Sequence, residues 1–231
     1  MEFSGFRPEG LDLLIENRLM NSKDFYESCK PRIRELVQEP FYALVERMAS
    51  TMCEIDPLLV IDPKRMVSRV RRDTRYTHDK SLYRDHAWIT FGRKKGEFAE
   101  RPCFYFEISP EFWGYGCGYY HAPPAEMRLA REMMLAEDKL FLDAFRAVEN
   151  NPQFSLYGEE YKRPKYPSAP AAYQPWLNRK NLGVSCNFID HTPLWDGRFV
   201  DGMLSDLRAL APLYHFFCTL KERTQGTEGV R

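Results

Sequence analysis

The chain has 231 residues, of which 44% are hydrophobic and 14% aromatic, so it carries enough apolar material for a folded core. Thirty-three Lys and Arg residues balance 33 Asp and Glu residues, and this zero net charge excludes a protein that is basic throughout, such as a general duplex-DNA binder. The length suits one large domain or one domain with an extension.

Helical periodicity dominates the first quarter of the chain. Pro8 can occupy the first turn of a helix that we expect over 8–19. A long helix is expected over 22–54, because apolar residues recur there at helical spacing and form one stripe. Pro31 and Pro40 are predicted to break or kink this helix.

The middle third changes to the two-residue period of strands. Strands are expected at 66–76, 86–91, 103–108 and 112–120, with turn residues at 92–96, and a further strand at 182–189. The first four follow one another without a helix-sized connection. Parallel pairing would need such a connection, so the sheet is predicted to be mainly antiparallel.

The last third returns to helices. They are expected after Pro124, over 138–149, and over 197–222 with an interruption at Pro212. The proline-rich stretch 158–176 is predicted to be an extended surface loop.

Together these elements predict an α+β fold. We expect a single domain over 1–223, in which a mainly antiparallel β-sheet packs against the long N-terminal helix and the C-terminal helices. Residues 224–231 are expected to form a disordered tail.

Several features bear on the compartment. The first ten residues lack the basic and apolar regions of a secretory signal, and no apolar run approaches the ~20 residues that a membrane-spanning helix needs. The six cysteines form no CxxC pair, and most are expected to be buried free thiols. A cytoplasmic protein without a membrane partner is therefore expected.

The most informative stretch is 64–84, which holds eight Lys and Arg residues against two Asp residues. The segment carries a charge of +6, so the rest of the chain carries −6. In a strand, Arg69, Arg71, Asp73 and Arg75 would share one face, with Arg72 on the other. Two arginines beside a carboxylate can hold it and still present free donors to a ligand phosphate or carboxylate.

At these residues the chain resembles a known family. The matching elements are Phe3-Ser4-Gly5-Phe6; Arg72-Asp73-Thr74-Arg75 with Asp79-Lys80 and Tyr83-Arg84; Gly118-Tyr119 with Pro123-Pro124, Arg128 and Arg131; and Lys162-Arg163-Pro164. In this order they are similar to the DUF2461 family of conserved hypothetical proteins. The resemblance implies a single α+β domain in a soluble, mostly microbial protein, and it implies no particular activity. The chain departs from the family pattern at Lys165-Tyr166, where a Lys-Gly pair is usual.

Other motifs that carry chemistry are incomplete. Gly114, Gly116 and Gly118 alternate, but Tyr119 takes the place of the third glycine of a dinucleotide fingerprint. Their bare strand face predicts either close backbone packing or the floor of a ligand site. No histidines have metal-ligand spacing and no nucleophile motif occurs, so we predict no metal and no cofactor, and whether the protein is an enzyme stays open.

The leading hypothesis is a pocket for a small anionic molecule that bears phosphate or carboxylate. Its predicted lining residues are Arg72, Asp73, Arg75, Asp79, Lys80, Tyr83, Arg84, Tyr119, Lys162 and Arg163. The cations would neutralise the anion and Asp73 would orient the arginines. Tyr83 or Asp79 could transfer a proton if a reaction occurs.

Two alternatives stay open. In the first, the protein is an interaction module whose basic sheet edge, with Arg69, Arg71 and Arg75 exposed, binds single-stranded nucleic acid or an acidic protein. In the second, the charged strand is an internal clamp of ion pairs, or protects a sheet edge by its charge. The sequence does not indicate an oligomeric state.

Overall fold

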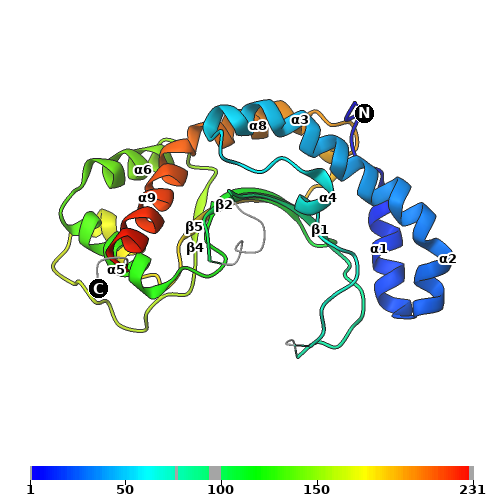
Figure 1. The fold of residues 1–231 in the computed structure, drawn as a ribbon, viewed down its shortest axis with the longest axis horizontal. Helices are drawn as coiled ribbons and strands as arrows, with labels where there is room; N and C mark the ends of the chain where they lie inside the picture. The colour runs from blue at the N-terminus through cyan, green and yellow to red at the C-terminus, as the bar shows by residue number, and fades with distance from the viewer. Residues whose placement is uncertain (1, 76–77, 94–99, 229–231) are drawn as a thin grey trace. The chain divides into compact units, whose positions relative to one another are not determined.

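The computed structural model describes residues 2–75, 78–93 and 100–228, and its fold is α+β, as the sequence predicts (Figure 1). The α-helices are α1 (Pro8–Met20), α2 (Lys23–Ile33), α3 (Glu39–Ile55), α4 (Pro63–Met66), α5 (Pro124–Leu135), α6 (Lys139–Glu149), α7 (Gln174–Leu177), α8 (Phe199–Ala209) and α9 (Ala211–Glu228). Short 3-10 turns lie at Ala171–Tyr173 and Thr192–Leu194.

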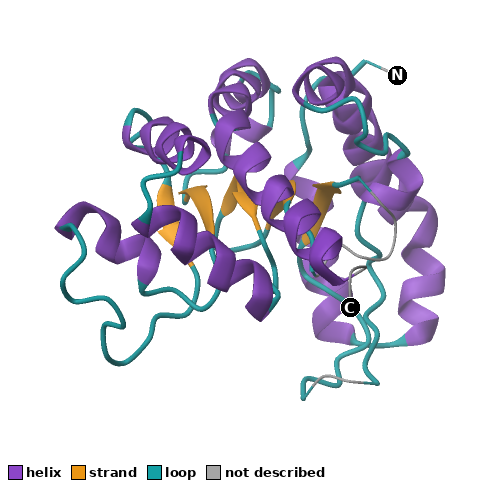
Figure 2. Ribbon diagram, turned by 60° about the vertical axis from the view of Figure 1, so that its left-hand side comes forward, coloured by secondary structure: helices purple, strands orange, loops and turns teal. Residues whose placement is uncertain are grey.

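One antiparallel sheet holds the strands (Figure 2). They are β1 (Ala87–Phe91), β2 (Cys103–Ile108), β3 (Trp113–Gly118), β4 (Ser155–Tyr157) and β5 (Gly183–Phe188), in the spatial order β1-β2-β3-β5-β4. Four of the five lie where the sequence predicts strands. The three-residue β4, which pairs with β5 through Leu156 opposite Val184, is too short to leave a periodic signal.

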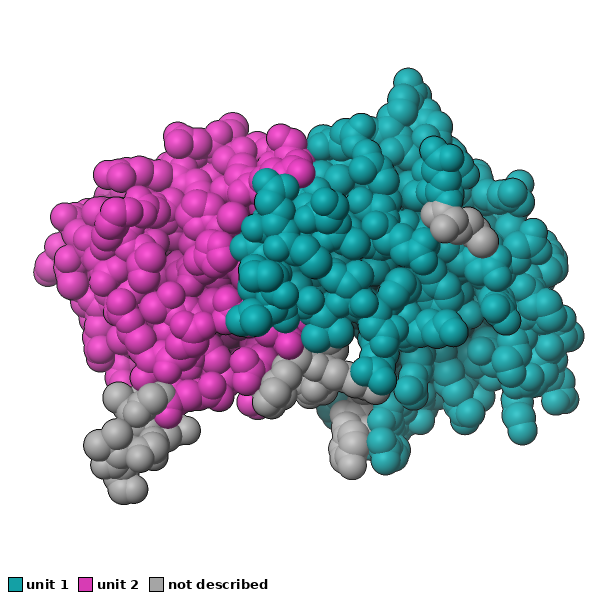
Figure 3. All heavy atoms as spheres, turned by 45° about the horizontal axis from the view of Figure 1, so that its top comes forward, with its two compact units in different colours: residues 1–91, 105–115, 187–204 teal, residues 92–104, 116–186, 205–231 magenta. Residues whose placement is uncertain are grey.

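The chain divides into two compact units, which Figure 3 colours separately. Unit 1 comprises residues 1–91, 105–115 and 187–204, and unit 2 comprises residues 92–104, 116–186 and 205–231. Each unit combines three separate stretches of the chain, so no composition change marks a boundary. The single domain expected over 1–223 stays a prediction.

Each unit has its own aromatic core. In unit 1 the rings of Phe6 and Phe106 stack with centroids 5.8 Å apart, and Phe41 lies 4.8 Å from Phe6. In unit 2 Phe141 contacts Trp176 edge to face at 5.7 Å, and α6 packs along α9. Such ring pairs add to the free energy gained by burying their area.

The long N-terminal helix is interrupted where prolines predict it. Pro31 lies inside α2 and Pro40 in the first turn of α3, and the segment between them, Arg34–Gln38, is a π-helix. In an α-helix the Pro40 ring would clash with the carbonyl of Leu36, and the wider π turn relieves this clash. A Cβ atom on Gly10 would stand 2.5 Å from that carbonyl oxygen. Helix α1 can therefore lie this close to the π-helix only because residue 10 is glycine.

The expected strand over 66–76 is wrong. Met66 ends α4, and the described residues from 67 to 75 form two isolated bridges, Val67 with Ile89 and Arg71 with Tyr83, in place of a strand. Four residue steps separate the bridges on one side and six on the other, so a continuous ladder cannot form. Tyr76 lies outside the described residues, as does most of the expected turn at 92–96.

Three expectations near the C-terminus are met fully or in part. The stretch 158–176 is mostly irregular, as expected, but it ends in a 3-10 turn and the start of α7. The expected interruption near Pro212 is confirmed, because α8 ends at Ala209 and α9 begins at Ala211 with Pro212 in its first turn. Helix α9 continues to Glu228, so the expected tail begins as helix, and residues 229–231 lie outside the described part of the chain.

Candidate anion-binding surface

Residues 64–84, named the basic ribbon here, belong to unit 1 and return on themselves before β1 (Figure 1). Backbone hydrogen bonds join the outgoing and returning halves, from Arg72 N to Leu82 O and from Arg84 N to Val70 O. The predicted alternation of faces holds over 69–75 although the segment is not a regular strand. Arg69, Arg71, Asp73 and Arg75 are exposed, whereas Val70 is buried and Arg72 and Thr74 are half-buried.

Arg84 fixes the backbone of the exposed face. Its Nη1 atom donates to the carbonyl oxygens of both Arg69 and Arg71, each at 2.8 Å. Its guanidinium also lies 5.0 Å from the centre of the Trp88 ring, and burial lowers its pKa. Because alternate residues of an extended chain point the same way, Arg84 holds Arg69 and Arg71 with their side chains on one side.

Asp79 is the acceptor at the centre of the ribbon's ion pairs. It accepts from Arg72 and from Arg18 of α1, and also from the backbone N–H and the hydroxyl of Ser81. These hydrogen bonds, first those from Ser81 and then that from Arg18, hold the pKa of the Asp79 carboxyl well below its usual range. Arg72 is thus neutralised inside the protein.

Asp73 and Arg75 form a second internal pair. The Arg75 Nε and Nη2 atoms donate to the two carboxylate oxygens at 3.0 and 2.7 Å, and these bonds lower the pKa of Asp73 to about 2. Nearby, Lys80 donates from Nζ to the carbonyl oxygen of Thr74 at 2.8 Å. These contacts stiffen the end of the ribbon.

Tyr83 is a packing residue in this structure. Only 2% of it is exposed, its ring stacks on Tyr26 with centroids 4.8 Å apart, and burial raises the pKa of its phenol. Arg18 donates to its carbonyl oxygen at 3.1 Å, and Asn21 accepts from the backbone N–H of Leu82 at 2.7 Å. The ribbon is therefore anchored on α1 and on the turn that follows it.

The structure brings seven of the predicted site residues together in the ribbon, and the other three belong to unit 2. Tyr119 is fully buried there, and its hydroxyl donates to Glu126 at 2.6 Å and lies 3.0 Å from the carbonyl oxygen of Phe217. Lys162 and Arg163 are exposed in the loop that follows β4. Arg18 and Asn21, which hold the ribbon, were missed because no local pattern connects α1 with residues about 60 positions later.

Arg69 and Arg71 are neighbouring cations on the exposed face of the ribbon. Within the described part of the chain, neither Arg69 nor Arg71 forms an ion pair, and both are exposed. Chemically, two guanidinium groups about 7 Å apart along an extended chain can each hold a carboxylate or phosphate oxygen pair. An anion with repeated charges fits this spacing.

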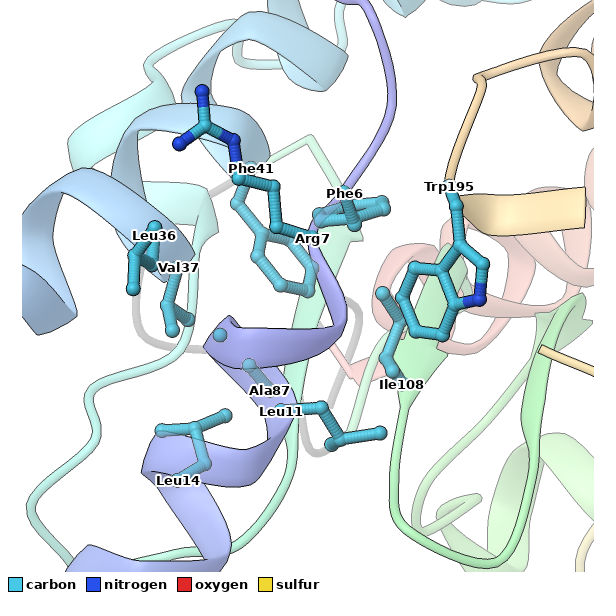
Figure 4. Close-up of a pocket in the computed structure, with 11 residues that line it drawn as sticks. Phe6, Arg7, Leu11, Leu14, Leu36, Val37, Phe41, Ala87, Ile108 and Trp195 are labelled. Atoms are coloured by element: carbon cyan, nitrogen blue, oxygen red, sulfur yellow. The ribbon is translucent and has the colours of Figure 1, made fainter. Parts of the chain in front are cut away.

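An apolar hollow of about 20 Å³ also lies in unit 1 (Figure 4). It lies between α1 and the π-helix, and its walls include Leu14, Val37, Phe41 and Ile108. None of the predicted site residues lines it. Its size and lining leave no room for a polar ligand, so it is a packing defect beside the Gly10 contact.

Metal ligands, membrane-spanning helices and cysteines are the other features that bear on function. Within the described ranges, no group of three or more His, Cys, Asp and Glu side chains is placed to hold a metal ion. In the same ranges, no helix has the length and apolar content needed to cross a bilayer. All six cysteines are free thiols; five are buried, as expected for most of them, and Cys53 is exposed.

Comparison with known protein families gives a match over most of the chain. Residues 9–216 match the model of a family described as "Conserved hypothetical protein (DUF2461)". No curated protein matches the sequence. The matched range includes the basic ribbon, Tyr119 and the loop with Lys162 and Arg163.

Proposed function

Given that the chain belongs to the DUF2461 family of conserved hypothetical proteins, we propose that it is an interaction module whose basic ribbon binds an acidic segment of a partner protein. One observation supports this most. Arg84 holds the exposed Arg69 and Arg71 side by side, and no carboxylate of the described chain neutralises either. A surface prepared in this way binds a polyanion with little loss of conformational entropy.

The shape of the ribbon favours an extended partner over a small ligand. Isolated ion pairs on an open surface contribute little, since water and salt screen them. A segment with acidic residues at alternate positions could engage both Arg69 and Arg71. Several weak contacts to one chain add up to useful affinity.

Single-stranded nucleic acid is a weaker candidate. Such binding needs exposed aromatic faces on which bases stack. Tyr83 is buried under Tyr26, and Arg84 and His86 both lie against the Trp88 ring. Among the described residues of the ribbon, these contacts favour binding of backbone phosphates over stacking of bases.

The compartment belongs to the same proposal. A reducing cytoplasm suits a chain with five buried free thiols and an exposed one at Cys53. There the partner would be another cytoplasmic protein with an acidic extended segment.

Fluorescence anisotropy tests the proposal. The probes are a labelled peptide of alternating Glu and Ser, about ten residues long so that it spans the ribbon, a Gln-Ser peptide of equal length, and an oligothymidine. Inorganic phosphate serves as competitor. The variant Arg69→Gln/Arg71→Gln is compared with Arg32→Gln/Arg128→Gln, which removes two exposed cations elsewhere.

We expect the Glu-Ser peptide to bind and the Gln-Ser peptide not to bind. The affinity for the Glu-Ser peptide should fall when the salt concentration is raised from about 50 to about 200 mM. Loss of Arg69 and Arg71 should weaken binding about fivefold, at about 0.5 kcal/mol for each contact. Tighter binding of oligothymidine would assign the surface to nucleic acid, and displacement by phosphate alone would assign it to a small anion. Equal losses in the two double variants would refute the proposal.

A further inference from the structure

A hollow within unit 2, named the α9 hollow here, is lined in part by charged side chains. It measures about 40 Å³, about twice the volume of the apolar hollow in unit 1. Helix α9 contributes Tyr214, Cys218, Lys221 and Gln225, which recur at helical spacing and so lie along one face of the helix. An amphipathic face of α9 therefore forms part of the lining.

The rest of the lining comes from the chain on either side of the connection between β1 and β2. Arg93 follows β1, and Arg101 and Pro102 precede β2. The apolar part of the lining is held in place, because the Tyr214 ring stacks on the Phe104 ring with centroids 4.8 Å apart and Pro102 is buried. The α9 hollow thus combines cations with a fixed apolar surface.

Lys221 is a largely buried cation with donors to spare. Its side chain is 15% exposed, and its Nζ atom lies 3.1 Å from Oε1 of Glu126, whose Oε2 atom accepts from the Tyr119 hydroxyl. An ammonium group has three N–H donors, and Glu126 is the acceptor that the described chain gives it. Buried donors normally have partners, so an acceptor inside the α9 hollow would complete this group.

The charges around the α9 hollow favour an anion. Its lining has three cations, Arg93, Arg101 and Lys221, and one carboxylate, Glu222, which pairs with Arg93 at 2.7 Å. Glu126, in contact with Lys221, adds a second carboxylate. Among these five side chains the cations exceed the carboxylates by one. A single negative charge in the hollow balances them.

We propose that the α9 hollow binds the carboxylate group of a small organic acid. Lys221 and Arg101 donate to the carboxylate oxygens, and Pro102 and Tyr214 contact the carbon atoms next to them. A space of about 10–15 Å³ holds one water molecule, so about 40 Å³ suits a group of the size of a carboxylate. A phosphate dianion is larger and carries more charge than these side chains lack. The site is independent of the basic ribbon, and neither proposal rests on the other.

Trifluoroacetate is a suitable probe, because broadening of its fluorine NMR signal reports weak binding of a carboxylate. Trifluoroethanol, which has no carboxylate, is the control probe. The variants Gln225→Glu and Gln225→Lys change the charge at an exposed position of the lining, so the fold should be kept, and circular dichroism checks this. Ser205→Glu and Ser205→Lys make the same changes at an exposed position of α8 that does not line the hollow.

We expect the wild-type chain to broaden the signal of trifluoroacetate but not that of trifluoroethanol, and acetate to displace the probe. Gln225→Glu should weaken binding of the probe about threefold and Gln225→Lys should strengthen it about threefold, because each places a unit charge near the bound carboxylate. The two Ser205 variants should bind the probe as wild type does, since solvent screens a distant surface charge.

Two further variants complete the test. Lys221→Gln should weaken binding of trifluoroacetate at least about tenfold. Arg69→Gln/Arg71→Gln should leave it unchanged, because the ribbon belongs to unit 1. Absence of broadening in the wild type, or equal effects of Gln225→Glu and Ser205→Glu, would overturn the proposal. Stronger displacement of the probe by inorganic phosphate than by acetate, at constant ionic strength, would also overturn it.

Discussion

The Nη2 atom of Arg131 donates a 2.6 Å hydrogen bond to the carbonyl oxygen of Arg179, 48 positions along the chain. The same guanidinium also bonds the carbonyl of Leu177 and, one helical turn back, that of Met127. One side chain thus fastens α5 to the end of α7 and to the segment before β5. It does so without any ion pair in the described chain.

Replacing Arg131 should therefore destabilise unit 2. Arg131→Met keeps the aliphatic stem but removes the side-chain donor to the carbonyls of Leu177 and Arg179, and we expect a loss of about 2–4 kcal/mol in the free energy of unfolding. Urea denaturation followed by circular dichroism measures it. The control Arg128→Met, on an exposed position of the same helix, should change stability by less than about 0.5 kcal/mol. Similar losses in both variants would contradict the assigned role.

Tyr119 offers a second stability test. Its buried hydroxyl donates to Glu126, which Lys221 also contacts at 3.1 Å, and burial raises the pKa of the phenol well above its usual value. Tyr119→Phe should cost about 1.5–3 kcal/mol, because a hydrogen bond to a charged group is lost in the interior. Tyr120→Phe, at a 72% exposed neighbour, is the control and should be neutral. If the two variants melt at the same temperature, the Tyr119 hydrogen bond contributes nothing to the stability of the fold.

Replacing the glycine at position 10 should destabilise the fold. A Cβ there would stand 2.5 Å from the Leu36 carbonyl oxygen, so Gly10→Ala must push α1 from the π-helix, at a cost of about 1–3 kcal/mol. Gly202→Ala in α8 meets nothing within 4 Å and should stabilise by up to about 1 kcal/mol through helix propensity. The melting temperatures of the two variants should thus shift in opposite directions from that of the wild type. An unchanged melting temperature for Gly10→Ala would show that the contact is not tight.

Asp79 gives a prediction for pH. Its carboxyl pKa is lowered in the folded chain, so its stabilising effect is complete above the unfolded value of about 3.9 and is lost as the pH falls through the folded value. Asp79→Asn should lower the melting temperature at pH 7, since Arg72 then loses its carboxylate partner and Arg18 is left with the longer carboxylate contact to Asp85, at 3.5 Å. The difference from wild type should shrink below about pH 4. Asp12→Asn, at an exposed aspartate of α1, should match wild type throughout, and a pH-independent deficit in Asp79→Asn would exclude the ion-pair explanation.

Local patterns in the sequence predict most of the fold. The strands at 103–108 and 182–189, the kink between Pro31 and Pro40 and the helix over 138–149 follow from period, turn residues and proline chemistry. The error at 66–76 also has a local cause. The alternation of exposed arginines is real there, but unequal spacing of the two bridges prevents a ladder, and nothing within the segment reveals its partner's spacing.

The candidate sites depend more on long-range contacts. The charge of the basic ribbon is visible in the sequence, but its anchor Arg18 lies in α1, and only the fold brings that residue to Asp79. Tyr119 is among the predicted lining residues, but its hydroxyl is buried against Glu126 and the carbonyl oxygen of Phe217. A Cβ on Gly118 would stand 2.4 Å from the Cα of Gly183, so close packing explains that glycine. The buried, carboxylate-free Arg131 likewise becomes visible only with the tertiary structure.

The proposed function is tested most directly by reversing charge on both sides of the complex. The wild-type chain and Arg69→Glu/Arg71→Glu are titrated with labelled Glu-Ser and Lys-Ser peptides at low salt. The account predicts that wild type binds only the Glu-Ser peptide, and that the double variant loses this peptide and gains affinity for Lys-Ser. Unchanged affinity of the double variant for the Glu-Ser peptide would contradict it.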